Sequence, residues 1–224
     1  SLYDTKFTVS KYLNLELQNQ ILLEENKNLK RILFNSETPT KSFDSINSIG
    51  FEVMTASVIK NSYSKANNFI TINKGAKHGI GIDNGVISSK GVVGIIDKTT
   101  TNYSRLISIL NTNFLLNAKF KNSNYFGVLS WNGKDINKVQ LKDVPKQAKI
   151  KIGDTIVTGG NSLIFPKGIL IGYIQSFKLD NSENYLELEV NLSTDMTNIE
   201  NLQYRLYIKT IYMTQLFISK MTCC

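Results

Sequence analysis

His78 is the single histidine of the chain and therefore the only candidate for an imidazole general base. Hydrolysis of the chymotrypsin type needs such a base, a carboxylate that orients it and an activated serine. His78 lies in NKGAKHGIGIDNGV, where the frequent glycines indicate an exposed turn. In GDTIVTGGN the residue after Asp154 is Thr155, and no serine stands in a G-D-S-G context. We therefore interpret His78 as a surface residue and keep a chymotrypsin-like hydrolase as the less favoured alternative.

Metal and nucleotide chemistry have little support in the sequence. The only cysteines, Cys223 and Cys224, end the chain side by side and cannot build a zinc site with one histidine. There is no G-x-G-x-x-G between a strand and a helix and no P-loop motif. The acidic residues are scattered, which gives little support to a glycosidase pair of carboxylates, although such a pair stays an open alternative. We expect a non-catalytic protein without cofactor or metal.

The positive charge of the chain is concentrated in lysines. The net charge is +8, and residues 113–180 hold ten lysines against four aspartates. Arg31, Arg105 and Arg205 are the only arginines. Nucleic-acid sites usually use arginine for bidentate phosphate and base contacts. We therefore expect a solvated lysine-rich face and no nucleic-acid partner.

Residues 11–34 have the pattern of a coiled-coil helix, without glycine or proline and rich in Leu, Glu, Gln and Lys. Leucines recur every seven residues at position d, and asparagine occupies two a positions, which is typical of a parallel two-stranded coiled coil. The residues predicted to form this dimer interface are Leu15, Asn19, Leu22, Glu25, Asn26, Leu29, Lys30 and Leu33. A single amphipathic helix packed on its own domain is the alternative.

From Phe51 onward the period of the sequence changes to two. Short runs such as GVISS, VVGII, GVLSW and YLELEVNL alternate with turn signals at intervals of 8–12 residues, as in antiparallel barrels. The predicted fold is mainly β: an N-terminal coiled-coil α-helix followed by two small antiparallel β-barrels. The expected parts are a helix (1–36), a linker (37–50), a discontinuous first barrel (51–112 and 173–209), a second barrel (113–172) and an irregular tail (210–224).

Three glycine-containing segments resemble the bacterial rod-shape protein family MreC. They are FITINKGAKHGIGIDNGVISSKGVVGIID (69–97), LNAKFKNSNYFGVLSWNGKD (116–135) and KIGDTIVTGGNSLIFPKGILIGYI (151–174). In the last segment, G-D-x-I-V-T-x-G, F-P-x-G-I and I-G follow the family's order and spacing. The helix LLEENKNLKRIL matches the family's usual prelude to the barrels, whereas the tail after Lys209 does not resemble the family.

The resemblance implies a homodimeric, non-catalytic periplasmic scaffold of the cell-elongation machinery that maintains cell shape. Its implied partners are MreB, MreD and a penicillin-binding transpeptidase of peptidoglycan synthesis. It also implies an inner-membrane anchor, which we expect upstream because the chain starts at Ser1 and contains no apolar run of spanning length. A periplasmic adaptor of a secretion or efflux system is the alternative, although such adaptors usually insert a helical hairpin between β segments.

Three aromatic residues near a predicted turn could anchor a protein partner. They are Tyr125, Phe126 and Trp131. Burial of these side chains in the barrel core is the favoured alternative.

Overall fold

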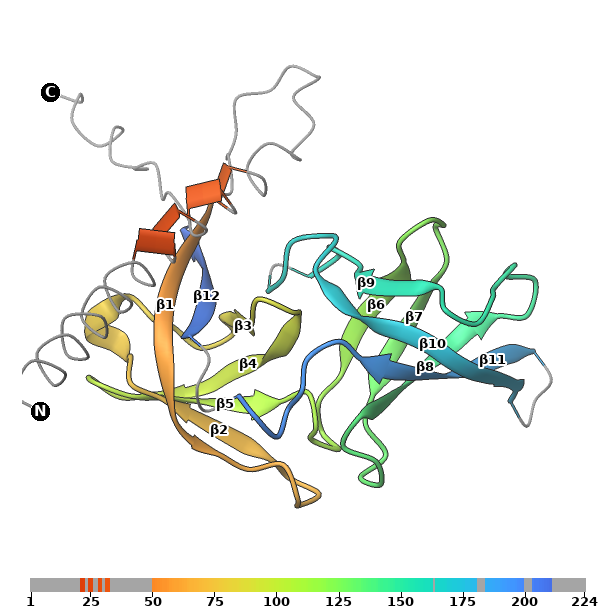
Figure 1. The fold of residues 1–224 in the computed structure, drawn as a ribbon, viewed down its shortest axis with the longest axis horizontal. Coiled ribbons are helices and arrows are strands. Elements are labelled where there is room, and N and C mark those ends of the chain that lie inside the picture. The colour runs from red at the N-terminus through yellow and green to blue at the C-terminus, as the bar shows by residue number, and fades with distance from the viewer. Residues whose placement is uncertain are drawn as a thin grey trace, which may run out of the picture.

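The computed structural model describes residues 50–162, 164–180, 184–199 and 203–210, together with eight residues between 21 and 32. The described strands form two β-barrels that lie side by side (Figure 1). Within this described part of the chain, no helix has the length and apolar character needed to cross a membrane.

The first barrel closes in the strand order β1-β12-β3-β4-β5-β2. Its strands are β1 (Gly50–Asn61), β2 (Phe69–Ile72), β3 (Gly85–Ile87), β4 (Val92–Thr99), β5 (Ser104–Ser108) and β12 (Gln203–Thr210), with a 3-10 turn, η1 (Ala76–His78), between β2 and β3. β12 pairs antiparallel with β1 on one side and with β3 on the other. A strand from late in the chain therefore closes a sheet that the first five strands begin.

The second barrel closes in the order β10-β11-β8-β7-β6-β9. Its strands are β6 (Leu116–Phe120), β7 (Phe126–Ser130), β8 (Lys138–Pro145), β9 (Thr155–Thr158), β10 (Leu170–Leu179) and β11 (Tyr185–Leu192). All neighbouring strands in it are antiparallel. This barrel is continuous in the sequence and is inserted between β5 and β12 of the first.

Side chains that alternate along each strand point in turn into the barrel and out of it. In β11, for example, Leu186, Leu188 and Val190 are buried while the residues between them are half-buried. Leu129 and Leu141 on the neighbouring strands are fully buried in the same core. These inward aliphatic side chains supply the hydrophobic stabilisation of the barrel.

The expected placement of residues 173–192 in the first barrel is wrong. Position 173 falls inside β10, which pairs with β9 up to Tyr173 and with β11 along Gly172–Leu179. A boundary there would divide one strand between two sheets. Among the described residues of 173–209, only those of β12 pair with strands of the first barrel. Strand pairing depends on residues far apart in the sequence. The alternation of apolar and polar residues alone therefore does not show where the chain returns from the second barrel to the first.

The backbones of the two barrels approach closely at their junction. A Cβ atom on Gly91 would lie 2.4 Å from the carbonyl oxygen of Leu170, closer than any side chain tolerates. The Ser193 hydroxyl lies 2.8 Å from the carbonyl oxygen of Lys90 and 3.0 Å from that of Ile171. The turn before β4 is therefore seated directly against the start of β10.

A buried aromatic ring and a hydroxyl pair complete the junction. The ring of Phe165 is fully buried, and a Cβ atom on Gly85 would lie 2.5 Å from it. The hydroxyls of Ser88 and Thr194 form a buried hydrogen bond of 3.1 Å. Apolar packing and satisfied polar groups thus both hold the barrels together.

The described residues of the expected coiled-coil segment are helical. They are Ile21, Leu22, Glu24, Glu25, Asn28, Leu29, Arg31 and Ile32, and all eight are exposed. The rest of the predicted helix, the 37–49 part of the linker and the tail after Thr210 lie outside the described residues.

Candidate interaction surface

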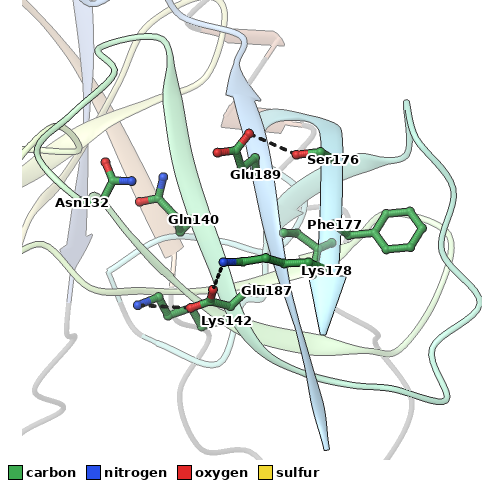
Figure 2. A pocket seen from close by; sticks show the side chains of 9 residues that line it. Asn132, Gln140, Lys142, Ser176, Phe177, Lys178, Glu187 and Glu189 are labelled. Atoms are coloured by element: carbon green, nitrogen blue, oxygen red, sulfur yellow. Dashed lines mark hydrogen bonds and ion pairs between the residues drawn. The ribbon is translucent and has the colours of Figure 1, made fainter. Parts of the chain in front are cut away.

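A shallow groove of about 380 Å³ lies on the second barrel, over strands β8, β10 and β11 (Figure 2). The residues lining it are Asn132, Gln140, Lys142, Ser176, Phe177, Lys178, Glu187, Leu188 and Glu189. Most of them are charged or amide side chains. Phe177 borders the groove with an exposed ring that points away from these polar side chains (Figure 2). The groove is therefore mainly polar, with an apolar group on its border.

Three adjacent strands place lysines and glutamates in a ladder across this groove. Glu187 on β11 lies 3.6 Å from the Nζ of Lys142 on β8 and 3.4 Å from the Nζ of Lys178 on β10. Glu189 lies 3.7 Å from the Nζ of Lys138 and accepts a 3.0 Å hydrogen bond from the Ser176 hydroxyl. Both glutamates are thus shared between neighbouring strands rather than held on opposite sides of a cleft.

One polar atom of the groove lacks a partner within the described part of the chain. The side-chain oxygen of Gln140 is shielded from solvent and accepts no hydrogen bond there. Gln140 is paired with Glu189 across β8 and β11, which places its amide inside the ladder (Figure 2). A buried acceptor without a donor costs about 1–3 kcal/mol, so an N–H group from a bound partner would be stabilising.

The arrangement around His78 does not resemble a catalytic triad. The Nδ1 atom of His78 accepts a 3.1 Å hydrogen bond from the backbone N–H of Gly75, so the ring helps to close the η1 turn. Desolvation and then the positive charges of Lys74 and Lys77 lower the pKa of His78. Among the described residues no group of histidines, cysteines and carboxylates could hold a metal ion.

The three predicted aromatic anchors occupy different environments. Trp131 is 4% exposed and donates a 2.8 Å hydrogen bond from Nε1 to the carbonyl oxygen of Asp135, so it is a core residue. Tyr125 is half-buried and packs against the core. Phe126 is 38% exposed. Of the three, only Phe126 is exposed.

Of the predicted dimer residues, three are described. Leu22, Glu25 and Leu29 are helical and exposed, with Leu22 at 54% and Leu29 at 65%. The other five lie outside the described residues: Leu15, Asn19, Asn26, Lys30 and Leu33. Leu22 and Leu29, seven positions apart, share one face of the helix, as the heptad pattern requires.

The lysine–glutamate ladder was not predicted, although the sequence carries a signal for it. Lys138, Gln140 and Lys142 alternate along one strand, and Glu187 and Glu189 alternate along another. Residues two apart on a strand share a face. Once β8 and β11 are known to pair, opposite charges at this spacing predict ion pairs between the two strands.

The model of a known family matches most of the described chain. This family is described as rod shape-determining protein MreC, barrel core, and the match covers residues 58–203. A curated relative, the cell shape-determining protein MreC of Listeria monocytogenes, is 31% identical over 171 residues, which cover 74% of this chain and 54% of the relative. The chain thus spans about half the length of this relative.

Solved structures share the two-barrel fold. The MreC structure from Listeria monocytogenes has a TM-score of 0.65 at 25% identity and covers 90% of this chain and 91% of its own. The major periplasmic domain of the cell shape-determining filament MreC has a TM-score of 0.63 at 19% identity, covering 74% and 100%. MreC in a complex with penicillin-binding protein PBP2 from Helicobacter pylori has a TM-score of 0.57 at 13% identity, covering 71% and 99%.

Proposed function

Because the chain belongs to the family of rod shape-determining protein MreC, we propose that it is a non-catalytic scaffold of the cell-elongation machinery, organising peptidoglycan-synthesis proteins to maintain cell shape. The match of the family's barrel core to residues 58–203, which include strands of both barrels, is the observation that carries this proposal. Two closed barrels joined by close backbone contacts provide rigid surfaces for several partners. The ion-paired glutamates of the groove support a binding role rather than a chemical one.

The first partner in this proposal is a penicillin-binding transpeptidase. A solved complex contains PBP2 and an MreC whose fold matches this chain, which supports the choice. The groove over β8, β10 and β11 is the proposed contact surface, since it holds an unsatisfied acceptor at Gln140 and is bordered by the exposed ring of Phe177. MreB and MreD are further proposed partners of the whole machinery.

The proposed location is the periplasm, next to the inner membrane and attached to it by an N-terminal anchor. The solved periplasmic domain with the same fold supports the compartment. A helix ahead of the barrels would then connect the anchor to the partner surfaces.

The proposed assembly is a parallel homodimer formed by the N-terminal helix. The exposure of Leu22 and Leu29 supports it, because apolar side chains at this spacing are covered when two helices form a coiled coil. Leu22→Asp combined with Leu29→Asp should give a folded monomer in sedimentation analysis, whereas the unmodified chain should sediment as a dimer. Equal masses for the two proteins would contradict the dimer.

The scaffold proposal is tested by binding of the full chain to a purified penicillin-binding transpeptidase from the same bacterium. We expect saturable binding that Phe177→Ser weakens about tenfold, since loss of a central aromatic contact often costs 1–2 kcal/mol or more. Tyr103→Ser is the matched control, because Tyr103 is a similarly exposed aromatic residue of the first barrel, at 51% against 44% for Phe177. Absence of binding would contradict the proposed partner. Equal affinity of the Phe177→Ser variant and the unmodified chain would contradict the groove as the contact surface.

A further inference from the structure

Lys119 is a buried lysine on the outer face of the second barrel. In β6 the side chains of Leu116, Ala118 and Phe120 point into the core, so that of Lys119 points outward. It is nevertheless only 5% exposed. Its surroundings include Lys167, from the loop after β9, and the ring of Phe126 on β7. Lysine is among the residues least often buried without a partner.

No carboxylate neutralises the ammonium group of Lys119. Among the described residues, Lys119 forms no ion pair and no hydrogen bond to an acceptor. The charged group that acts on it is instead another lysine, Lys167. Burial and then the positive charge of Lys167 lower the pKa of the Lys119 ammonium. Two like charges side by side destabilise the fold unless an anion lies between them.

The second lysine is held in place by the backbone around it. The Thr158 hydroxyl donates a 2.6 Å hydrogen bond to the carbonyl oxygen of Pro166 and accepts one of 2.9 Å from the N–H of Ile169. A Cβ atom on Gly160 would lie 2.6 Å from the Cβ of Lys167, and the φ angle of Gly160 is +79°. The loop is therefore tightly folded, and Lys167 is anchored on both sides.

An exposed aromatic ring borders the two lysines. Phe126 is paired with Lys119 across β6 and β7, and the Lys119 Nζ lies 5.9 Å from the centre of its ring. A Cβ atom on Gly159 would lie 3.5 Å from the same ring, so the ring is packed against the loop. A ligand at this position would meet two ammonium groups and one face of an apolar ring.

We propose that Lys119, Lys167 and Phe126 form a recognition site for a carboxylate of an acidic protein segment that carries an apolar residue beside the acidic one. A carboxylate has two oxygens that can accept from two ammonium groups, and such charge-assisted hydrogen bonds are the strong ones. Anionic lipid surfaces instead attract clusters of fully exposed lysines. Here one of the two lysines is buried and an aromatic ring stands beside it, which favours a peptide.

The site deepens the scaffold function proposed above, and it is distinct from the groove over β8, β10 and β11. The test is fluorescence anisotropy of the full chain with the labelled peptide Glu-Phe-Asp-Leu-Glu and its uncharged counterpart Gln-Phe-Asn-Leu-Gln. We expect the acidic peptide to bind and the uncharged one to bind at least about tenfold more weakly, given the strength of charged hydrogen bonds.

Substitutions distinguish binding at this site from non-specific attraction of the acidic peptide to a positively charged protein. Lys119→Met and Lys167→Ala should each weaken the acidic peptide about tenfold, whereas Lys121→Met, at an exposed lysine just beyond β6, should leave it unchanged. Lys119→Met should also raise the Tm by a few degrees, because it removes a buried unpaired charge, so weaker binding cannot result from unfolding.

The site would be overturned by equal affinity of the Lys119 and Lys121 variants, or by equal affinity for the two peptides. Binding to phosphatidylglycerol vesicles through Lys119 without binding of the acidic peptide would also overturn it, in favour of a lipid surface. If the acidic peptide does not bind but the penicillin-binding protein does, this inference alone is refuted. If the peptide binds but the penicillin-binding protein does not, only the proposed transpeptidase partner is refuted.

Discussion

The two barrels contain the same number of antiparallel strands but are assembled from the chain in different ways. The second barrel uses β6 to β11, which follow each other without interruption from Leu116 to Leu192. The first barrel takes five strands from before this stretch and β12 from after it. Contacts between distant segments form late, because closing a long loop costs entropy. The inserted barrel can therefore complete its fold first, whereas the first barrel depends on both ends of the described chain.

The two barrels also differ in how they hold their charges. In the first barrel, Arg105 and Asp97 form one bidentate pair between β5 and β4, and the guanidinium lies 4.2 Å from the centre of the Phe69 ring. In the second barrel, single lysine contacts at 3.4–3.7 Å link several strands. A bidentate pair that stacks on a ring fixes one geometry, whereas an exposed lysine ladder leaves its groups available for exchange with a partner.

Removal of residues 203–224 should have the largest effect, and it should act on one barrel only. Without β12, strands β1 and β3 lose their shared neighbour and the first barrel opens. Hydrogen exchange should show lost protection in β1 to β5 and retained protection in β6 to β11. Removal of residues 211–224 alone leaves β12 in place and is the control. Equal loss of protection in both barrels would mean that they unfold as one unit.

Substitution of the glycine at the junction should have the next largest effect. Gly91→Ala places a Cβ atom against the backbone of Leu170, and neither backbone can retreat without separating the barrels. We expect a loss of about 2–4 kcal/mol in the free energy of unfolding, measured in urea. Gly81→Ala is the control, since its Cβ atom would meet nothing closer than 3.7 Å. A neutral Gly91→Ala would show that the junction adapts.

Loss of the bidentate ion pair should cost more than loss of the ladder. Asp97 is 17% exposed in its side chain and Arg105 37%, so water screens them only in part. Asp97→Asn should lower the free energy of unfolding by about 1 kcal/mol, whereas Glu187→Gln should change it by less than about 0.5 kcal/mol. Urea unfolding at low and high salt measures both. Equal costs would remove the distinction between the two charge arrangements.

A small effect that depends on pH should come from the connection between β11 and β12. Hydrogen bonds from the hydroxyl and then the N–H of Thr197 lower the pKa of Asp195, because they stabilise its carboxylate. A lowered pKa in the folded state means stability that is present above the ordinary pKa of about 4 and is lost as the pH falls below it. Asp195→Ala should therefore cost about 0.5–1 kcal/mol at pH 7 and less at pH 3. A cost that grows on acidification would contradict this assignment.

The sequence predicts the classes of element well, because those follow from local periodicity. The runs GVISS, VVGII and YLELEVNL lie on strands β3, β4 and β11. The eight described residues between 21 and 32 are helical, while the coiled-coil helix as a whole stays a prediction. Which strands share a sheet is not local. β10 could pair with either barrel on pattern alone, and the structure assigns it to the second.

Burial of individual polar and aromatic residues was predictable only in part. Trp131 is in the core, as its size favours, and its indole N–H finds a backbone acceptor. Lys119 could not be predicted as buried, because its surroundings include Lys167, from a loop far later in the chain. The groove over β8, β10 and β11 depends in the same way on strand neighbours that the sequence does not specify.

The insertion of one barrel into the other has a mechanical consequence. A body attached by one polypeptide link can rotate about it, but the second barrel is attached by two links, one after β5 and one after β11, and the contact of Gly91 with Leu170 lies between the barrels as well. Torsion applied to one barrel must therefore pass to the other. A protein built in this way is expected to transmit twist and tension from one barrel to the other and to resist free rotation between them.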